Sequence, residues 1–188
     1  MRRFLSTLFV FSFGAAMTLA AGAQEGKSMS SKESAGTTTT DTAFVKKAAR
    51  GGLAEVELGQ LAVQKASSEE VKKFGQRMVD DHSKANDQLK QVAAQEHIDL
   101  PQAPSAKDKA TKARLEKLSG EQFDKAYMSD MVKDHQKDVA EFEHESKTAK
   151  DPTVKSFAQQ TLPTLRQHLK EAEKIAPKQQ QAERTSGQ

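Results

Sequence analysis

The chain contains no cysteine and no tryptophan among its 188 residues, and aromatic residues make up only 5% of it. Without cysteine, no disulfide can stabilise the fold, no thiolate can serve as a nucleophile or metal ligand, and no lipid can be attached to a cysteine. The stability of the folded protein must therefore come from buried apolar surface.

Long hydrophobic runs are also scarce, because only one is present, from Phe4 to Ala20. It follows two arginines and precedes the small-residue triplet Ala21-Gly22-Ala23, a pattern typical of a secretory signal with its cleavage site. We therefore predict a signal peptide over residues 1–23 and no transmembrane span after its removal. The expected location is the periplasm or the outside of a bacterial cell.

Neither sign of charge is in large excess, since 29 basic residues face 26 acidic ones and the net charge is +3. Two arginines leave with the predicted signal, so the mature chain carries 27 − 26, or +1. With few aromatic residues and no dense basic cluster, the sequence predicts no nucleic-acid surface. It also contains no recognisable set of nucleophile, histidine and acid, which favours a non-enzymatic role with no catalytic residues.

Strand signals are missing, because apolar and polar residues do not alternate with a period of two and turn-forming residues are sparse. Apolar residues instead recur at helical spacing, which predicts an all-α domain over residues 41–176. Residues 24–40 are rich in Ser and Thr and predict a flexible leader. Residues 177–188 are rich in Gln and predict a disordered tail.

Four main helices are expected within this domain, over residues 41–66, 67–97, 119–149 and 152–175, with a short extra helix over 106–118. Asp41 is the expected start of the first helix, and Ser67 with Glu70 predicts a capping box for the second. One short turn, one long crossover and another short turn describe a ferritin-like four-helix bundle. Three glycines of the first helix, Gly51, Gly52 and Gly59, predict close approach of a neighbouring backbone.

Two stretches of the chain are alike, Met78-Val79-Asp80-Asp81-His82-Ser83-Lys84 and, 53 residues later, Met131-Val132-Lys133-Asp134-His135-Gln136-Lys137. The likeness predicts two related helical hairpins. Because facing helices can direct paired imidazoles into one core, it also draws attention to the two histidines.

Helical geometry places His82 and His135 centrally on the apolar faces of their helices, Glu55 within the apolar face of the first helix, and His168 towards one side of the last. One inward polar group from each main helix predicts a metal site on Glu55, His82, His135 and His168, for Fe, Zn, Mn or Cu. A buried Glu–His hydrogen-bond network without metal explains the same pattern. Asp81 is expected either to support such a site or to pair with a neighbouring lysine.

Four segments together resemble the bacterial family called domain of unknown function 4142. They are Ala48–Gly59 (AARGGLAEVELG), Met78–His82 (MVDDH), Leu118–Asp124 (LSGEQFD) and Leu162–Leu169 (LPTLRQHL). The resemblance covers about residues 41–175. It implies an exported ferritin-like bundle of the kind often labelled an outer-membrane protein, and it implies no established reaction.

Two functions remain open from the sequence. The first is an exported bundle that binds a metal ion in its core. The second is a non-catalytic envelope or stress protein that acts through contacts with an unknown protein partner, with peripheral attachment to the outer membrane as one version of it.

Overall fold

The computed structural model describes residues 37–186, with side chains described as far as Lys178. The predicted signal peptide and most of the predicted leader lie outside these residues. The described part forms five helices and no strand: α1 (Thr39–Lys65), α2 (Glu69–Gln95), α3 (Ala106–Glu116), α4 (Gly120–Thr148) and α5 (Pro152–Ser186). In this part of the chain, no helix combines the length and the apolar character needed to cross a membrane.

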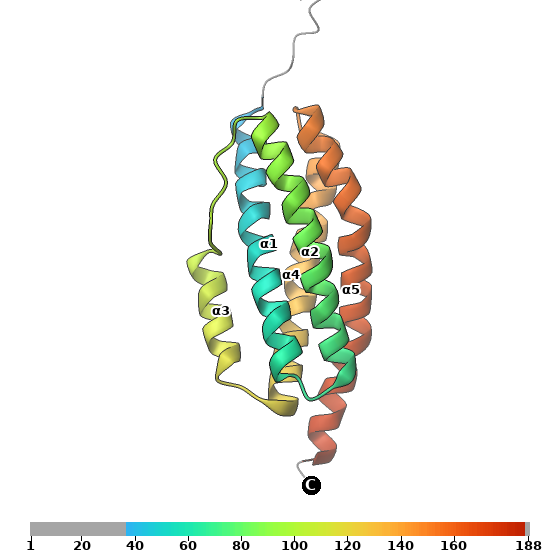
Figure 1. Cartoon of the computed structure of the whole chain (residues 1–188). Helices are drawn as coiled ribbons and strands as arrows, with labels where there is room; N and C mark the ends of the chain where they lie inside the picture. Colours follow the sequence, from blue (N-terminus) through green and yellow to red (C-terminus); the bar gives the residue numbers. More distant parts are fainter. Residues whose placement is uncertain (1–36, 187–188) are drawn as a thin grey trace, which may run out of the picture. The chain divides into compact units, whose positions relative to one another are not determined.

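The helices form two hairpins, α1 with α2 and α4 with α5, and α2 also packs against α5 (Figure 1). The connection between the hairpins carries α3 along the outside of α1, so that α2 and α4 run in the same direction. A four-helix bundle with one long crossover is the ferritin-like layout. The predicted all-α bundle with an extra helix in its crossover is therefore confirmed.

The core consists of two apolar clusters that follow each other along the bundle. One cluster contains Met78, Met131 and Ala172, and the other contains Leu89, Phe142 and Leu165. In sequence, His82, His135 and His168 each fall between a residue of the first cluster and a residue of the second. The helical rise therefore places three histidines at the level where the two clusters meet.

Each hairpin turn is held by a buried aspartate from the other hairpin. Asp124 of α4 is fully buried and accepts hydrogen bonds from the backbone amides of Ser67 (3.1 Å) and Ser68 (2.8 Å) and from the Ser67 hydroxyl (2.6 Å). Asp41 of α1 likewise accepts from the backbone amide of Asp151 (3.0 Å). The predicted capping box of Ser67 and Glu70 is wrong, because Ser68 is the N-cap of α2, and the amide and hydroxyl of Ser67 both donate to Asp124.

The helix ends differ from the expected ones at both termini of the bundle. Thr38 is the N-cap of α1 and forms a capping box with Asp41, which the sequence placed at the cap itself. The last helix, α5, continues through Pro163 and Pro177 to Ser186, whereas the sequence predicted that folded structure ends at residue 176. Asp151 caps α5, since its carboxylate accepts from the amides of Thr153 and Val154.

The glycines of α1 fall into two groups. A Cβ on Gly59 would lie 2.6 Å from the backbone oxygen of Gly75, and one on Gly52 would meet the side chain of Asn86, so both glycines permit close packing against α2. A Cβ on Gly51 would have nothing within 4 Å. The expected close approach is therefore wrong for Gly51, which borders open space.

Candidate metal centre

Three histidines from three helices meet in the core. One ring nitrogen from each of His82 on α2, His135 on α4 and His168 on α5 lies within 4.8 Å of the other two. The ring centroids are 5.3–5.8 Å apart. All three residues are buried, with exposed fractions of 7%, 0% and 1%. Among the described residues this is the one group of histidines and carboxylates with the spacing of a metal site.

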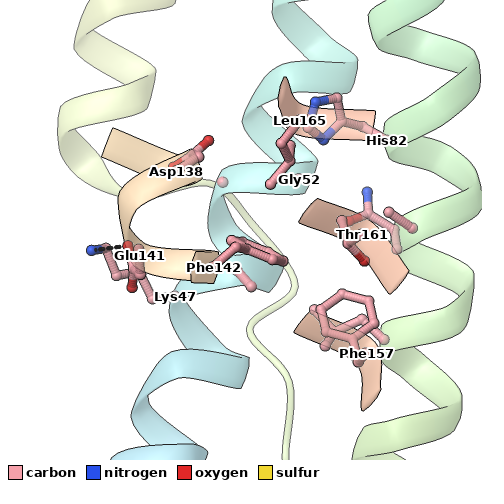
Figure 2. A pocket seen from close by; sticks show the side chains of 14 residues that line it. Lys47, Gly52, His82, Asp138, Glu141, Phe142, Phe157, Thr161 and Leu165 are labelled. Carbon is pink, nitrogen blue, oxygen red and sulfur yellow. Dashed lines mark hydrogen bonds and ion pairs between the residues drawn. The ribbon is translucent and has the colours of Figure 1, made fainter. Parts of the chain in front are cut away.

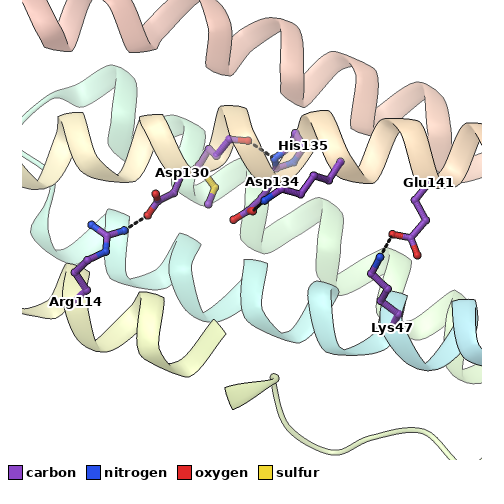
Figure 3. Close-up of polar contacts among 8 residues, drawn as sticks. Lys47, Arg114, Asp130, Asp134, His135 and Glu141 are labelled. Atoms are coloured by element: carbon purple, nitrogen blue, oxygen red, sulfur yellow. Dashed lines mark hydrogen bonds and ion pairs between the residues drawn. The ribbon is translucent and has the colours of Figure 1, made fainter. Parts of the chain in front are cut away.

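In two of the three rings, one nitrogen lies within hydrogen-bond distance of a protein acceptor. His135 Nδ1 lies 3.0 Å from the backbone oxygen of Met131, one turn earlier in α4 (Figure 3). His168 Nε2 lies 2.9 Å from the Asp81 carboxylate of α2. Each contact fixes the ring and, with the proton on the bonded nitrogen, leaves the other nitrogen with a free lone pair. Histidines that bind metals are commonly held in this way. Asp81 thus takes the supporting position that the sequence allowed for it.

Each histidine also has one unpartnered ring nitrogen, namely His82 Nε2, His135 Nε2 and His168 Nδ1. They are buried and have no hydrogen-bond partner among the described residues. A buried polar atom without a partner costs about 1–3 kcal/mol, so three together are a substantial cost for a structural core. A cation shared by the three nitrogens would remove that cost.

The environment keeps the three imidazoles neutral. Burial lowers the pKa of His82 well below its usual value, and the neighbouring His135 and His168 lower it further. Burial, followed by the influence of His168, lowers the pKa of His135 to about 4. The pKa of His168 is lowered by burial, against the opposing effect of Asp81. Neutral imidazole is the form that binds metal ions.

Three imidazole ligands suit zinc, copper, iron and nickel better than magnesium or calcium, which prefer oxygen. With Zn–N bonds of about 2.0–2.1 Å, ligand nitrogens in a tetrahedral site lie roughly 3.3 Å apart. Nitrogens already within 4.8 Å of one another would need only small side-chain rotations to reach that spacing. Three protein ligands would also leave one coordination position for water or another ligand.

Glu55, the fourth predicted ligand, lies outside the histidine group. Its side chain is buried, with 4% exposure, and its Oε2 has no partner among the described residues. It lines a cavity of about 480 Å³ between α1, α3 and α4. Burial raises the pKa of Glu55 well above its usual value, and the nearby Asp138 and Asp134 raise it further.

A second cavity, of about 40 Å³, reaches His82 itself. Figure 2 shows His82 across this cavity from Asp138, with Gly52 between them. Burial raises the pKa of Asp138 to about 7, and the carboxylates of Glu141 and Asp134 add to the shift. Sequence reasoning missed Asp138, although its position three residues after the inward His135 puts it about 60° away around α4.

The other two histidines of the described residues are exposed. His144 lies near the end of α4, in a local Glu-x-x-His sequence that forms no metal group. His97 follows α2 with a positive φ of 53°, a conformation typical of a helix end. Burial therefore separates the three histidines of the candidate centre from these two.

Comparison with known proteins identifies a family and a fold. A family described as "Domain of unknown function (DUF4142)" matches residues 26–175. The chain is similar in structure to a protein described as "putative secreted protein DUF305 from Streptomyces coelicolor", with a TM-score of 0.63 and 13% identity over 74% of this chain and 93% of that one. It is also similar to a DUF305 fragment from Deinococcus radiodurans, with a TM-score of 0.67 and 17% identity over 76% and 99%. No curated protein matches the sequence.

Proposed function

The chain belongs to the DUF4142 family, and for this member we propose a function as an exported metal-binding protein that holds one transition-metal ion on His82, His135 and His168. The proposal rests above all on three buried histidines that bring one ring nitrogen each to within 4.8 Å of one another, and that each have a buried ring nitrogen without a protein partner. A purely structural core would gain stability by replacing them with apolar side chains.

The supporting contacts strengthen this proposal. His135 and His168 each use one nitrogen for a protein acceptor, so the proton lies on that nitrogen and the other nitrogen keeps its lone pair. A core without a bound cation has no need to fix both tautomers in this sense. The ligand set favours zinc, copper or iron over manganese, because manganese prefers oxygen ligands.

We place this function in the periplasm, on the basis of the predicted signal peptide, with peripheral association with the outer membrane as a further proposal. The structural neighbour described as secreted is consistent with export. Storage, sequestration or defence against oxidants are the roles that a metal-binding bundle of this kind would serve there.

Elemental analysis by mass spectrometry tests the proposal, on mature protein purified from the periplasm without an affinity tag or chelator. We expect about one equivalent of metal in the wild type and none in the double variant His82→Ala/His135→Ala. The variant His144→Ala, which removes an exposed histidine from α4, should retain the full amount. Circular dichroism of each variant shows whether the bundle remains helical.

The variant His168→Leu separates lost ligation from lost packing, because leucine fills a similar volume with apolar atoms. We expect it to fold and to bind metal at least tenfold more weakly, since a lost ligand removes one of three bonds. Wild-type protein that contains no metal, and takes up none of Zn²⁺, Cu²⁺, Fe²⁺ or Mn²⁺, would overturn the proposal. That outcome would favour the alternative function, recognition of an envelope protein.

A further inference from the structure

The two cavities beside the histidine group share part of their walls. The larger cavity is lined by Glu55, and the smaller one by His82. Lys47, Gly51, Asp138 and Glu141 line both. A ligand that enters the larger cavity from solvent therefore meets these shared residues before it reaches the histidines.

The larger cavity is lined by six carboxylates, and four of them have partners. Asp134 pairs with Lys137, Glu141 with Lys47 and Asp130 with Arg114, while Asp108 caps α3 through Ser105 (Figure 3 shows the pairs of Glu141 and Asp130). Arg50, Lys107 and Lys133 also line the cavity, but all three are exposed to solvent.

Glu55 and Asp138 are the two lining carboxylates without a hydrogen bond or ion pair among the described residues. Glu55 is the more deeply buried, its Oε2 has no partner among the described residues, and the residue lines the cavity. Asp138 stands at the boundary between the two cavities. The two acids thus lead from the larger cavity towards the smaller one, which His82 lines.

We propose that the cavity of Glu55 is a transit site for a divalent transition-metal cation, which Glu55 and Asp138 bind in succession on its way to the histidine group. Carboxylates hold such ions more weakly than three imidazoles do, so the ion moves on rather than remaining. The inference rests on the proposed function, because it requires the histidine group to be the final site.

Gly51 gives the same route a physical opening. A Cβ added to Gly51 would have no other atom within 4 Å, and Gly51 borders both cavities. A helix interior normally disfavours glycine by about 1 kcal/mol relative to alanine. An open passage at this position would account for a glycine here despite that cost, because a side chain would obstruct the passage.

Stopped-flow absorbance of Co²⁺ binding to the metal-free mature protein tests the route. We expect the double variant Glu55→Gln/Asp138→Asn to bind Co²⁺ about tenfold more slowly, because neither amide can give up a proton and bind the cation as a carboxylate does. Release of the ion to excess chelator should slow by the same factor, since a transit site lowers the barrier in both directions. The equilibrium Kd should therefore remain within about twofold of the wild type.

Three further variants separate the effect of charge from the effect of space. Gly51→Leu fills the opening without removing a carboxylate, and it should slow both rates together, whereas Ala43→Leu at an exposed position of α1 should not. Glu143→Gln removes one charge from α4 outside both cavities and should leave both rates unchanged.

The outcomes distinguish this inference from the proposed function. Wild-type binding and release rates in the Glu55/Asp138 double variant and in Gly51→Leu would overturn the transit site and leave the histidine site intact. Faster release with a raised Kd in Glu55→Gln would also overturn it, by making Glu55 a ligand of the bound ion. Failure of the wild type to bind Co²⁺, Zn²⁺ or Cu²⁺ would overturn both proposals.

Discussion

Asp138 should lower the stability of the bundle at neutral and alkaline pH. Its carboxyl group is largely buried, and the negative charges of Glu141 and Asp134 add to the effect of burial, while Lys47 and Lys137 oppose it. Together these groups raise the pKa from 3.8 to about 7. The folded state therefore keeps a proton on Asp138 at pH values where the unfolded chain has lost it.

The sign of the effect follows from this difference in bound protons. Between about pH 4 and pH 7 the folded protein binds more protons than the unfolded chain, so the free energy of unfolding falls as the pH rises. A shift of about three pKa units corresponds to roughly 4 kcal/mol, and partial exposure of the side chain reduces this to about 2–4 kcal/mol. The loss is absent below pH 4 and complete above pH 7.

Asp138→Asn removes the titrating group and keeps its shape. We expect the variant and the wild type to have nearly equal free energies of unfolding at pH 4, and the variant to be about 2–4 kcal/mol more stable at pH 8. Urea unfolding followed by circular dichroism at both pH values measures the difference. Asp87→Asn, at an exposed position paired with Lys90, should change stability by less than about 0.5 kcal/mol at either pH. An Asp138→Asn effect of equal size at pH 4 and pH 8 would refute the reasoning.

Three other predictions concern packing and binding. Asp124→Ala should destabilise the bundle by about 3–5 kcal/mol in urea unfolding, because it leaves three donors of the α1–α2 turn without their buried acceptor; a loss below 1 kcal/mol would contradict the role given to that carboxylate. Gly59→Ala should destabilise by about 1–3 kcal/mol through its clash with α2, whereas Gly51→Ala should stabilise by about 0.5–1 kcal/mol, and equal effects would count against the packing described. A metal ion at 100 times its Kd should raise the unfolding free energy by about 2.7 kcal/mol and Tm by roughly 5–10 °C in calorimetry, and the same rise in the His135→Ala variant would argue against the site.

The sequence predicted the helices because their signal is local. Apolar residues at helical spacing identified four main helices and the short helix of the crossover, and the structure confirms all five. The contact just before α2 could not be predicted, because Asp124, which accepts from the Ser67 amide, lies 57 residues from Ser67 in the chain. The local pattern of Ser67 and Glu70 carries no information about Asp124, which accepts from the same Ser67 amide that Glu70 would bind in a capping box.

The sequence predicted which side chains of the candidate site face the core, but it did not predict which of them meet. Helical periodicity shows which way a side chain faces, and it placed Glu55, His82 and His135 inward, where the structure buries them. It does not show which neighbouring helix an inward group faces, and this decides which inward groups meet. Glu55 therefore faces the cavity of about 480 Å³ rather than the histidine group, and the contact between Asp81 and His168 appears only in three dimensions.

The two buried aspartates hold the two hairpins together without a disulfide, and a metal ion on the histidine group would do the same. Asp124 reaches from α4 to the α1–α2 turn, and Asp41 reaches from α1 to the α4–α5 turn, so each hairpin clamps the end of the other. Between these ends, the group takes His82 from the first hairpin and His135 from the second. A metal ion bound there would crosslink the hairpins at mid-height, where the apolar core is interrupted. Metal binding would then stabilise the contact between hairpins more than either hairpin alone, and hydrogen exchange should slow most in α2, α4 and α5 around the three histidines.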